Sequence, residues 1–78
     1  MTDVSNRVFS VFQRVLHLPD RSPTEALVYN QFPGWDSVAH MSIIAALEDE
    51  FDCMLDTGDV LDMSSFAKAV EIVGKYIV

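Results

Sequence analysis

The stretch that decides the fold is GWDSVAHMSIIAALEDEF, residues 34–51. Asp36 or Ser37 can cap the start of a helix here, since either side chain can accept a hydrogen bond from the first turn. Two apolar lines with helical spacing follow. The line predicted to face inward is Ile43, Ile44, Leu47 and Phe51. The line rotated away from it is Val38, Met41 and Ala45. We expect one helix ending near Phe51 with two apolar faces.

Helical periodicity also occurs on both sides of this stretch. A first helix is predicted from about Val4 to Leu16, with Asp3 or Ser5 as its N-cap. Its apolar stripe is Val8, Val11, Phe12, Val15 and Leu16. Residues 59–61 can form about one further turn, and a last helix runs from a cap at Ser64 or Ser65 to about Ile77. Its predicted apolar face is Phe66, Val70, Val73 and Ile77.

A long connection, about residues 18–35, separates the first two predicted helices. Pro19 and Pro23 begin it, and the turn signal Pro33-Gly34 closes it. Because an unstructured stretch of this length is unusual in a compact domain, we expect its apolar residues to pin it across the core. These residues are Leu27, Val28, Tyr29 and Phe32. The predicted fold is all-α, a small bundle of three main helices and one short helix with a long first loop, forming a single domain over residues 1–78.

The charge of the chain is concentrated in one segment. Five Lys plus Arg against twelve Asp plus Glu give a net charge of −7. The acids of residues 36–62, a range that holds no Lys or Arg, are Asp36, Glu48, Asp49, Glu50, Asp52, Asp56, Asp59 and Asp62. Binding of nucleic acid or of an anionic membrane surface is therefore not expected, because both need clustered basic residues.

The same composition favours a small intracellular binding or carrier module. No apolar run approaches the roughly 18 residues that span a bilayer, and residues 1–4 lack the layout of a signal peptide. We therefore expect a cytoplasmic monomer that is not integral to a membrane. Cys53 is the only cysteine, which excludes an internal disulfide, and the neighbouring acids should raise the pKa of its thiol and leave it inert.

Glu48, Asp49 and Glu50 stand at the end of the predicted helix where the helix dipole is negative. Each such charge costs about 0.3–1 kcal/mol at low salt. Acids that stand at the unfavourable end of a helix, with no evident local interaction to offset the cost, suggest a functional use.

Catalytic and metal sites are poorly supported. Ser37, His40 and Asp36 could nominally form a hydrolytic set, but no third group clearly orients His40, and so small a chain can hardly enclose a cleft. The acids from Asp52 to Asp59 lack the spacing of a calcium loop, so no metal site is assigned, and a weak surface site for divalent ions is the alternative. His17, near the end of the first helix, has a structural interpretation, because a cation suits the dipole there.

Two motifs in the deciding stretch together resemble a known family. Asp36-Ser37-Val38 opens the predicted second helix, and Leu47-Glu48-Asp49-Glu50-Phe51 ends it. Both are similar to the acyl carrier proteins of the phosphopantetheine-binding superfamily, which have an Asp-Ser-Leu tripeptide and a Leu-Glu-x-x-Phe ending at these places. Val38 replaces the commoner Leu. The resemblance covers the whole acidic helical chain.

The resemblance implies that Ser37 receives 4′-phosphopantetheine from coenzyme A through a separate phosphopantetheinyl transferase with Mg²⁺, and that Asp36 is recognised by that transferase. The alternatives are that either residue only caps the helix. The chain itself would not catalyse a reaction; it would carry acyl groups as thioesters for fatty acid, polyketide or specialised acyl-transfer enzymes. The other implied partners are an acyl-loading ligase or transferase and a ketosynthase. The runner-up hypothesis is an acidic helical interaction module without a prosthetic group.

The resemblance also implies a docking face for these partners. Its residues would be Val38, Met41, Ala45, Glu48 and Asp49, with Asp56 and Asp59 as further candidates. Core packing is the alternative for Met41, and a solvated surface is the alternative for the acids. Trp35 and His40 flank the attachment point and are candidate contacts of the arm or its cargo, although packing in the loop and bundle accounts for them equally well.

Overall fold

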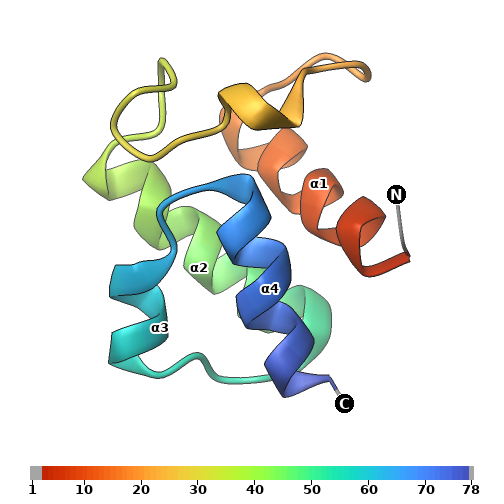
Figure 1. Ribbon diagram of the computed structural model, residues 1–78, viewed down its shortest axis with the longest axis vertical. Helices are drawn as coiled ribbons and strands as arrows, with labels where there is room; N and C mark the ends of the chain where they lie inside the picture. Colours follow the sequence, from red (N-terminus) through yellow and green to blue (C-terminus); the bar gives the residue numbers. More distant parts are fainter. Residues whose placement is uncertain (1–2, 78) are drawn as a thin grey trace.

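The computed structural model describes residues 3–77, and within this range every regular element is helical. The elements are α1 (Asp3–Leu16), the 3₁₀ helix η1 (Thr24–Ala26), α2 (Ser37–Phe51), α3 (Thr57–Asp62) and α4 (Phe66–Tyr76). Helix α1 packs against both α2 and α4, and the short α3 lies at the edge of the bundle (Figure 1). The predicted small all-α fold with three main helices and one short helix is confirmed.

The core is aromatic where α1, α4 and the long loop meet. Phe12 of α1 contacts Trp35 and Phe66 edge-on, with ring centroids 5.0 Å and 5.5 Å apart. Such edge-to-face pairs add about 0.5–1.5 kcal/mol to the burial of the rings. The predicted inward face of α2 is confirmed, since its four members are all buried: Ile43, Ile44, Leu47 and Phe51. One side of α2 is thereby fixed in the core.

The long loop is pinned across the core largely as predicted. Leu27 is fully buried, and Tyr29 and Phe32 are partly buried against the core, whereas Val28 is half-buried outside the core cluster. The backbone of the loop bonds to the start of α4, since Phe66 N donates to the Leu27 carbonyl and Tyr29 N donates to the Ser64 carbonyl. Gly34 closes the loop with a φ of +94°, a conformation that glycine adopts without steric cost. The chain therefore enters α2 from a rigid support.

Three local predictions are wrong. Helix α1 already begins at Asp3, so neither Asp3 nor Ser5 is its N-cap. Helix α3 has six residues instead of one turn, because the Asp56 side chain caps it by accepting from Asp59 N. The buried face of α4 is Phe66, Ala69, Ile72 and Val73. Val70 is only partly buried, and Ile77 lies beyond the helix and is 39% exposed. Phe66 packs against α1, and with this orientation of the helix the small Ala69 faces the core.

Candidate functional site at the start of α2

Ser37 is the first residue of α2 and its side chain is exposed. Asp36 is the N-cap, because its Oδ1 accepts a hydrogen bond from Ala39 N at 2.9 Å. Ser37 is therefore not the cap, and its hydroxyl is not used to satisfy the helix backbone. The Ser37 Oγ lies 3.2 Å from the hydroxyl of Tyr29, which the loop places beside it. The site thus presents a solvent-facing hydroxyl at the positive end of a helix dipole.

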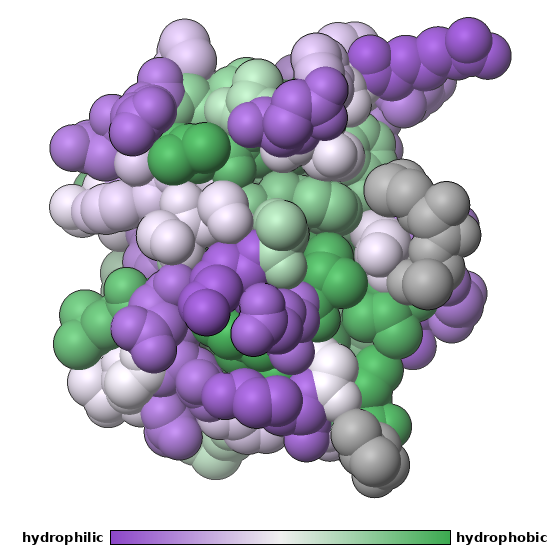
Figure 2. All heavy atoms as spheres, in the orientation of Figure 1, coloured by the Kyte–Doolittle hydropathy of each residue, from purple (hydrophilic) through white to green (hydrophobic). Residues whose placement is uncertain are grey.

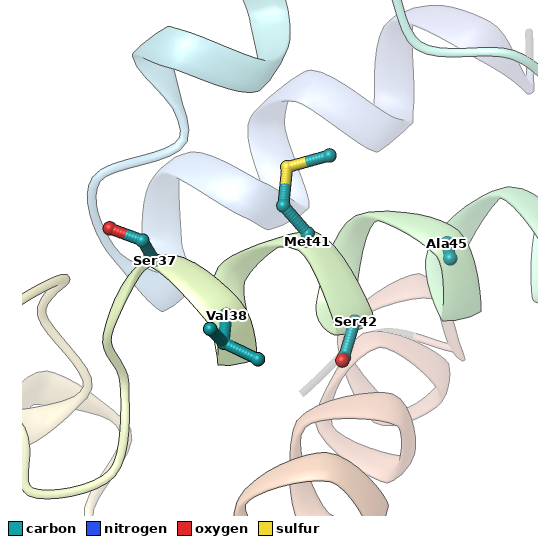
Figure 3. Close-up of a pocket in the computed structure, with 5 residues that line it drawn as sticks. All are labelled: Ser37, Val38, Met41, Ser42 and Ala45. Carbon is teal, nitrogen blue, oxygen red and sulfur yellow. The ribbon is translucent and has the colours of Figure 1, made fainter.

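An open, shallow groove runs from this serine along the outer face of α2. It is lined by Ser37, Val38, Met41, Ser42 and Ala45 (Figure 3). Val38 is 77% exposed and Met41 59% exposed, so core packing does not explain Met41. The structure thus brings Val38, Met41 and Ala45 together with Ser37 on one face. Ser42 was missed, although its spacing of four residues from Val38 is a signal that could have found it.

Trp35 belongs to the core, being only 1% exposed. Its indole N–H donates to His40 Nδ1 at 3.0 Å, and His40 Nε2 lies 2.9 Å from the Val60 carbonyl. Because the indole N–H can only donate, Nδ1 accepts and the ring proton is on Nε2, which donates to Val60. In this arrangement packing accounts for Trp35, whose ring presents almost no surface to an arm. His40 is half-buried and joins α2 to α3.

The same bonds bear on the hydrolytic interpretation. Both ring nitrogens of His40 are engaged, by Trp35 and by Val60, so neither is free to take a proton from Ser37. Ser37 and Asp36 lie next to each other, but the Asp36 carboxylate caps the helix. The three residues are close in space without the geometry of a nucleophile, base and orienting acid.

Two of the three acids at the C-terminal end of α2 have partners in the folded chain. Glu48 accepts a hydrogen bond from Leu55 N at 2.9 Å, which closes the chain after the helix. Glu50 Oε2 lies 2.9 Å from Arg7 Nε, and Arg7 Nη2 donates to the Glu50 carbonyl. The expectation that these charges have no local gain is therefore wrong for Glu48 and Glu50. Asp49 is exposed and makes no side-chain hydrogen bond or ion pair within residues 3–77.

Asp59 is tied to α4. Its Oδ1 lies 2.7 Å from Lys75 Nζ, and its Oδ2 accepts from the Tyr76 hydroxyl. The Lys75 hydrogen bond, followed by that from Tyr76, lowers the pKa of the Asp59 carboxyl. Figure 2 shows hydrophilic side chains gathered over the space between α3 and α4, in the lower half of the view. Because Asp56 caps α3, both further docking candidates have structural partners.

Three remaining features concern thiol reactivity, metal binding and the membrane. Burial raises the pKa of the Cys53 thiol, and the nearby Glu48 and Asp52 carboxylates raise it further, which suits an inert thiol. Among the residues described, no three His, Cys, Asp or Glu side chains are grouped as metal ligands. No helix within residues 3–77 is both long enough and apolar enough to cross a membrane.

Comparison with known proteins identifies no relative. No family model matches the chain, no curated protein is detectably similar to it, and no solved structure matches its fold. The function must therefore be argued from the geometry of the site and from the motifs in residues 34–51.

Proposed function

We propose that this protein is a carrier protein in which Ser37 is the attachment point of 4′-phosphopantetheine. The observation that carries the proposal is the exposed Ser37 hydroxyl at the N-terminus of α2, beside an open apolar groove. The Asp36-Ser37-Val38 motif and its resemblance to acyl carrier proteins support the same assignment. When attached, the arm supplies a thiol that carries an acyl group as a thioester between partner enzymes.

The residues present fit this group. A Ser37 Oγ–phosphorus bond forms, and the pyrophosphate bond of coenzyme A breaks and releases adenosine 3′,5′-bisphosphate. The Ser37 proton passes to a base of the transferase, since both nitrogens of His40 are engaged. The resulting phosphodiester anion is favoured at a helix N-terminus, where the dipole is positive. Recognition of Asp36 by the transferase is part of the proposal, in addition to its role as the N-cap.

The outer face of α2 is the proposed docking face for partner enzymes. Val38, Met41 and Ala45 offer the apolar contact area, and Asp49 offers a charge without a partner in the described chain. Enzymes with basic residues around their active sites would be attracted to this face, and such attraction mainly raises the rate of encounter. The proposed partners are the phosphopantetheinyl transferase, an acyl-loading ligase or transferase, and a ketosynthase or similar acyl-transfer enzyme.

Intact mass measurement tests the proposal. The purified chain is incubated with coenzyme A, Mg²⁺ and a broad-specificity phosphopantetheinyl transferase. The wild type should gain one phosphopantetheine group, and Ser37→Ala should gain none. Ser42→Ala is the matched control, because Ser42 is exposed in the same groove and should leave the gain intact. No gain with several transferases would overturn the proposal and favour an interaction module that uses the same groove without a prosthetic group.

A further inference from the structure

Tyr29 reaches the attachment serine from the long loop. Its hydroxyl lies 3.2 Å from Ser37 Oγ, and either oxygen can be the donor. Because Asp36 caps the helix, the Ser37 hydroxyl is otherwise free to rotate among three staggered positions. A hydrogen bond to a fixed partner selects one of these positions. The distance is long for an O–H···O bond, so a modest effect is expected in the unmodified protein.

Tyr29 itself is held from two sides. Its backbone N–H donates to the Ser64 carbonyl at 2.9 Å, and the preceding Val28 pairs with Ser65 in an isolated β-bridge. Its ring centroid lies 4.9 Å from that of His40 and 6.1 Å from that of Trp35. The phenol ring therefore packs on a support that is fixed before any partner arrives.

The support is rigid because His40 is bonded at both ring nitrogens. Trp35 Nε1 donates to one nitrogen from the core, and the other bonds to the Val60 carbonyl on α3. Trp35 and His40 also stack, with 21° between their ring planes. The two residues that the sequence placed beside the arm thus lie behind Tyr29, and Tyr29 is the member of this cluster that contacts Ser37.

We propose that Tyr29 is a positioning residue for the phosphopantetheinylation of Ser37, an inference that rests on the proposed carrier function. In the unmodified protein it orients the Ser37 hydroxyl. As the Oγ–phosphorus bond forms, Oγ loses its proton and can only accept, so Tyr29 becomes the donor. It then donates to a charged non-bridging oxygen of the phosphodiester, and hydrogen bonds to charged acceptors are stronger than neutral ones. The contact therefore strengthens along the reaction.

Steady-state kinetics of the transferase with the carrier as variable substrate tests this role. Tyr29→Phe removes only the hydroxyl and keeps the ring contacts. Its kcat should fall about threefold to tenfold, because one of three hydroxyl orientations is no longer selected and the hydrogen bond that strengthens during the reaction is lost. KM and the melting temperature should be unchanged. Tyr76→Phe is the matched control. Its hydroxyl contacts Asp56 and Asp59, so it should lower the melting temperature and leave kcat unchanged.

The phosphorus-31 spectrum of the modified protein gives a second readout. The phosphodiester shift should differ between the wild type and Tyr29→Phe, and should be the same in the wild type and Tyr76→Phe. Equal kcat values and equal shifts for Tyr29→Phe and the wild type would overturn the proposal. A rise in KM alone would also overturn it, because it would assign Tyr29 to binding of the transferase. A wild type that is never modified would instead overturn the carrier function, and the role of Tyr29 with it.

Discussion

At the N-terminal end of α2 the side chains of Ser37, Val38 and Met41 are exposed, whereas at the C-terminal end Glu48 and Glu50 are half-buried and bonded to other parts of the chain. The N-terminal end is supported from behind by the Trp35–His40 pair. The C-terminal end is fastened to α1 through Arg7, which bonds to Glu50 and lies over the Phe51 ring at 4.4 Å. One helix thus combines a presenting end with an anchoring end.

The comparison divides the acidic segment into two classes. The acids with partners in the structure are Asp36, Glu48, Glu50, Asp56 and Asp59. The exposed acids without a side-chain hydrogen bond or ion pair in residues 3–77 are Asp49, Asp52 and Asp62. Five of these eight acids therefore have structural roles, at the two ends of α2 and at α3, and the other three are left for the proposed attraction of partners.

The largest expected effect comes from the support of the presenting end. Trp35→Ala removes a fully buried ring from its contact with Phe12 and leaves His40 Nδ1 without its donor. We expect the free energy of unfolding to fall by about 3–5 kcal/mol in urea titrations followed by circular dichroism. Val38→Ala, at an exposed position on the same helix, should change it by less than about 0.5 kcal/mol. A loss below about 1 kcal/mol for Trp35→Ala would contradict the support that Trp35 is said to give to the N-terminal end of α2.

Glu48 and Asp49 are neighbours in the sequence, but Glu48 has a partner in the structure and Asp49 has none among residues 3–77. Glu48→Lys removes the acceptor of Leu55 N–H and should lower the free energy of unfolding by about 1–3 kcal/mol. Asp49→Lys makes the same change of charge at an exposed position and should not lower the free energy of unfolding, because it replaces an acid with a cation at the negative end of the helix dipole. Urea titration measures both values.

The rate of phosphopantetheinylation provides the complementary measurement on the same pair. Asp49→Lys should slow modification, and the slowing should shrink as salt is added, because screening weakens attraction between exposed charges. An unchanged rate in Asp49→Lys at low salt would remove Asp49 from the docking face. Equal stability of the two variants would show that Glu48 is not an anchor.

Arg7 tests the anchoring end directly. Arg7→Ala removes two hydrogen bonds to Glu50 and the contact with the Phe51 ring. Because the Arg7 side chain is 42% exposed, we expect a loss of only about 1 kcal/mol in urea titration. Arg14→Ala is the control, since Arg14 lies 3.9 Å from Glu50 and is 64% exposed, and its loss should be near zero. Equal losses would mean that the geometry of Arg7 adds nothing beyond its charge.

The sequence predicted the α2 faces well because the relevant spacing is local. Ile43, Leu47 and Phe51 are large apolar residues at helical intervals, and the other faces of that helix are less hydrophobic. In α4 the pattern is ambiguous, because Val70 is as apolar as Val73. Which of two adjoining apolar lines faces α1 depends on tertiary contacts of Phe66, and the small Ala69 gives a weak signal of burial.

The candidate site likewise has features that local spacing predicts and features that it does not predict. Ser37 and the groove lie on one helix, so their grouping followed from spacing alone. The contact of Tyr29 with Ser37, the Arg7–Glu50 pair and the Asp59–Lys75 pair join residues far apart in the chain or in different elements. No periodic signal encodes such contacts. From the sequence, Glu48, Asp49, Asp56 and Asp59 are docking candidates with a solvated surface as the alternative, and only the packed helices show which acids have partners.

The smallest expected effect concerns the pH dependence of the bonds between α3 and α4. The Lys75 and Tyr76 hydrogen bonds lower the pKa of the Asp59 carboxyl, so its contribution to stability is present above its ordinary pKa and is lost as pH falls through the lowered value, below about pH 4. The hydrogen bond to Asp59 raises the pKa values of Lys75 and Tyr76, so their contributions are lost as pH rises above about 10.

Melting temperatures recorded across both pH ranges measure this contribution. Asp59→Asn should flatten the curve at both ends relative to the wild type, because the Asp59 carboxylate accepts the hydrogen bonds of both Lys75 and Tyr76. Asp62→Asn, an exposed change on the same helix, should leave the wild-type curve shape intact. If Asp59→Asn and Asp62→Asn give the same curve, Asp59 is free of α4 in solution. Asp59 would then belong with Asp49 among the acids that are available to attract partners, and fewer acids of residues 36–62 would have a structural role.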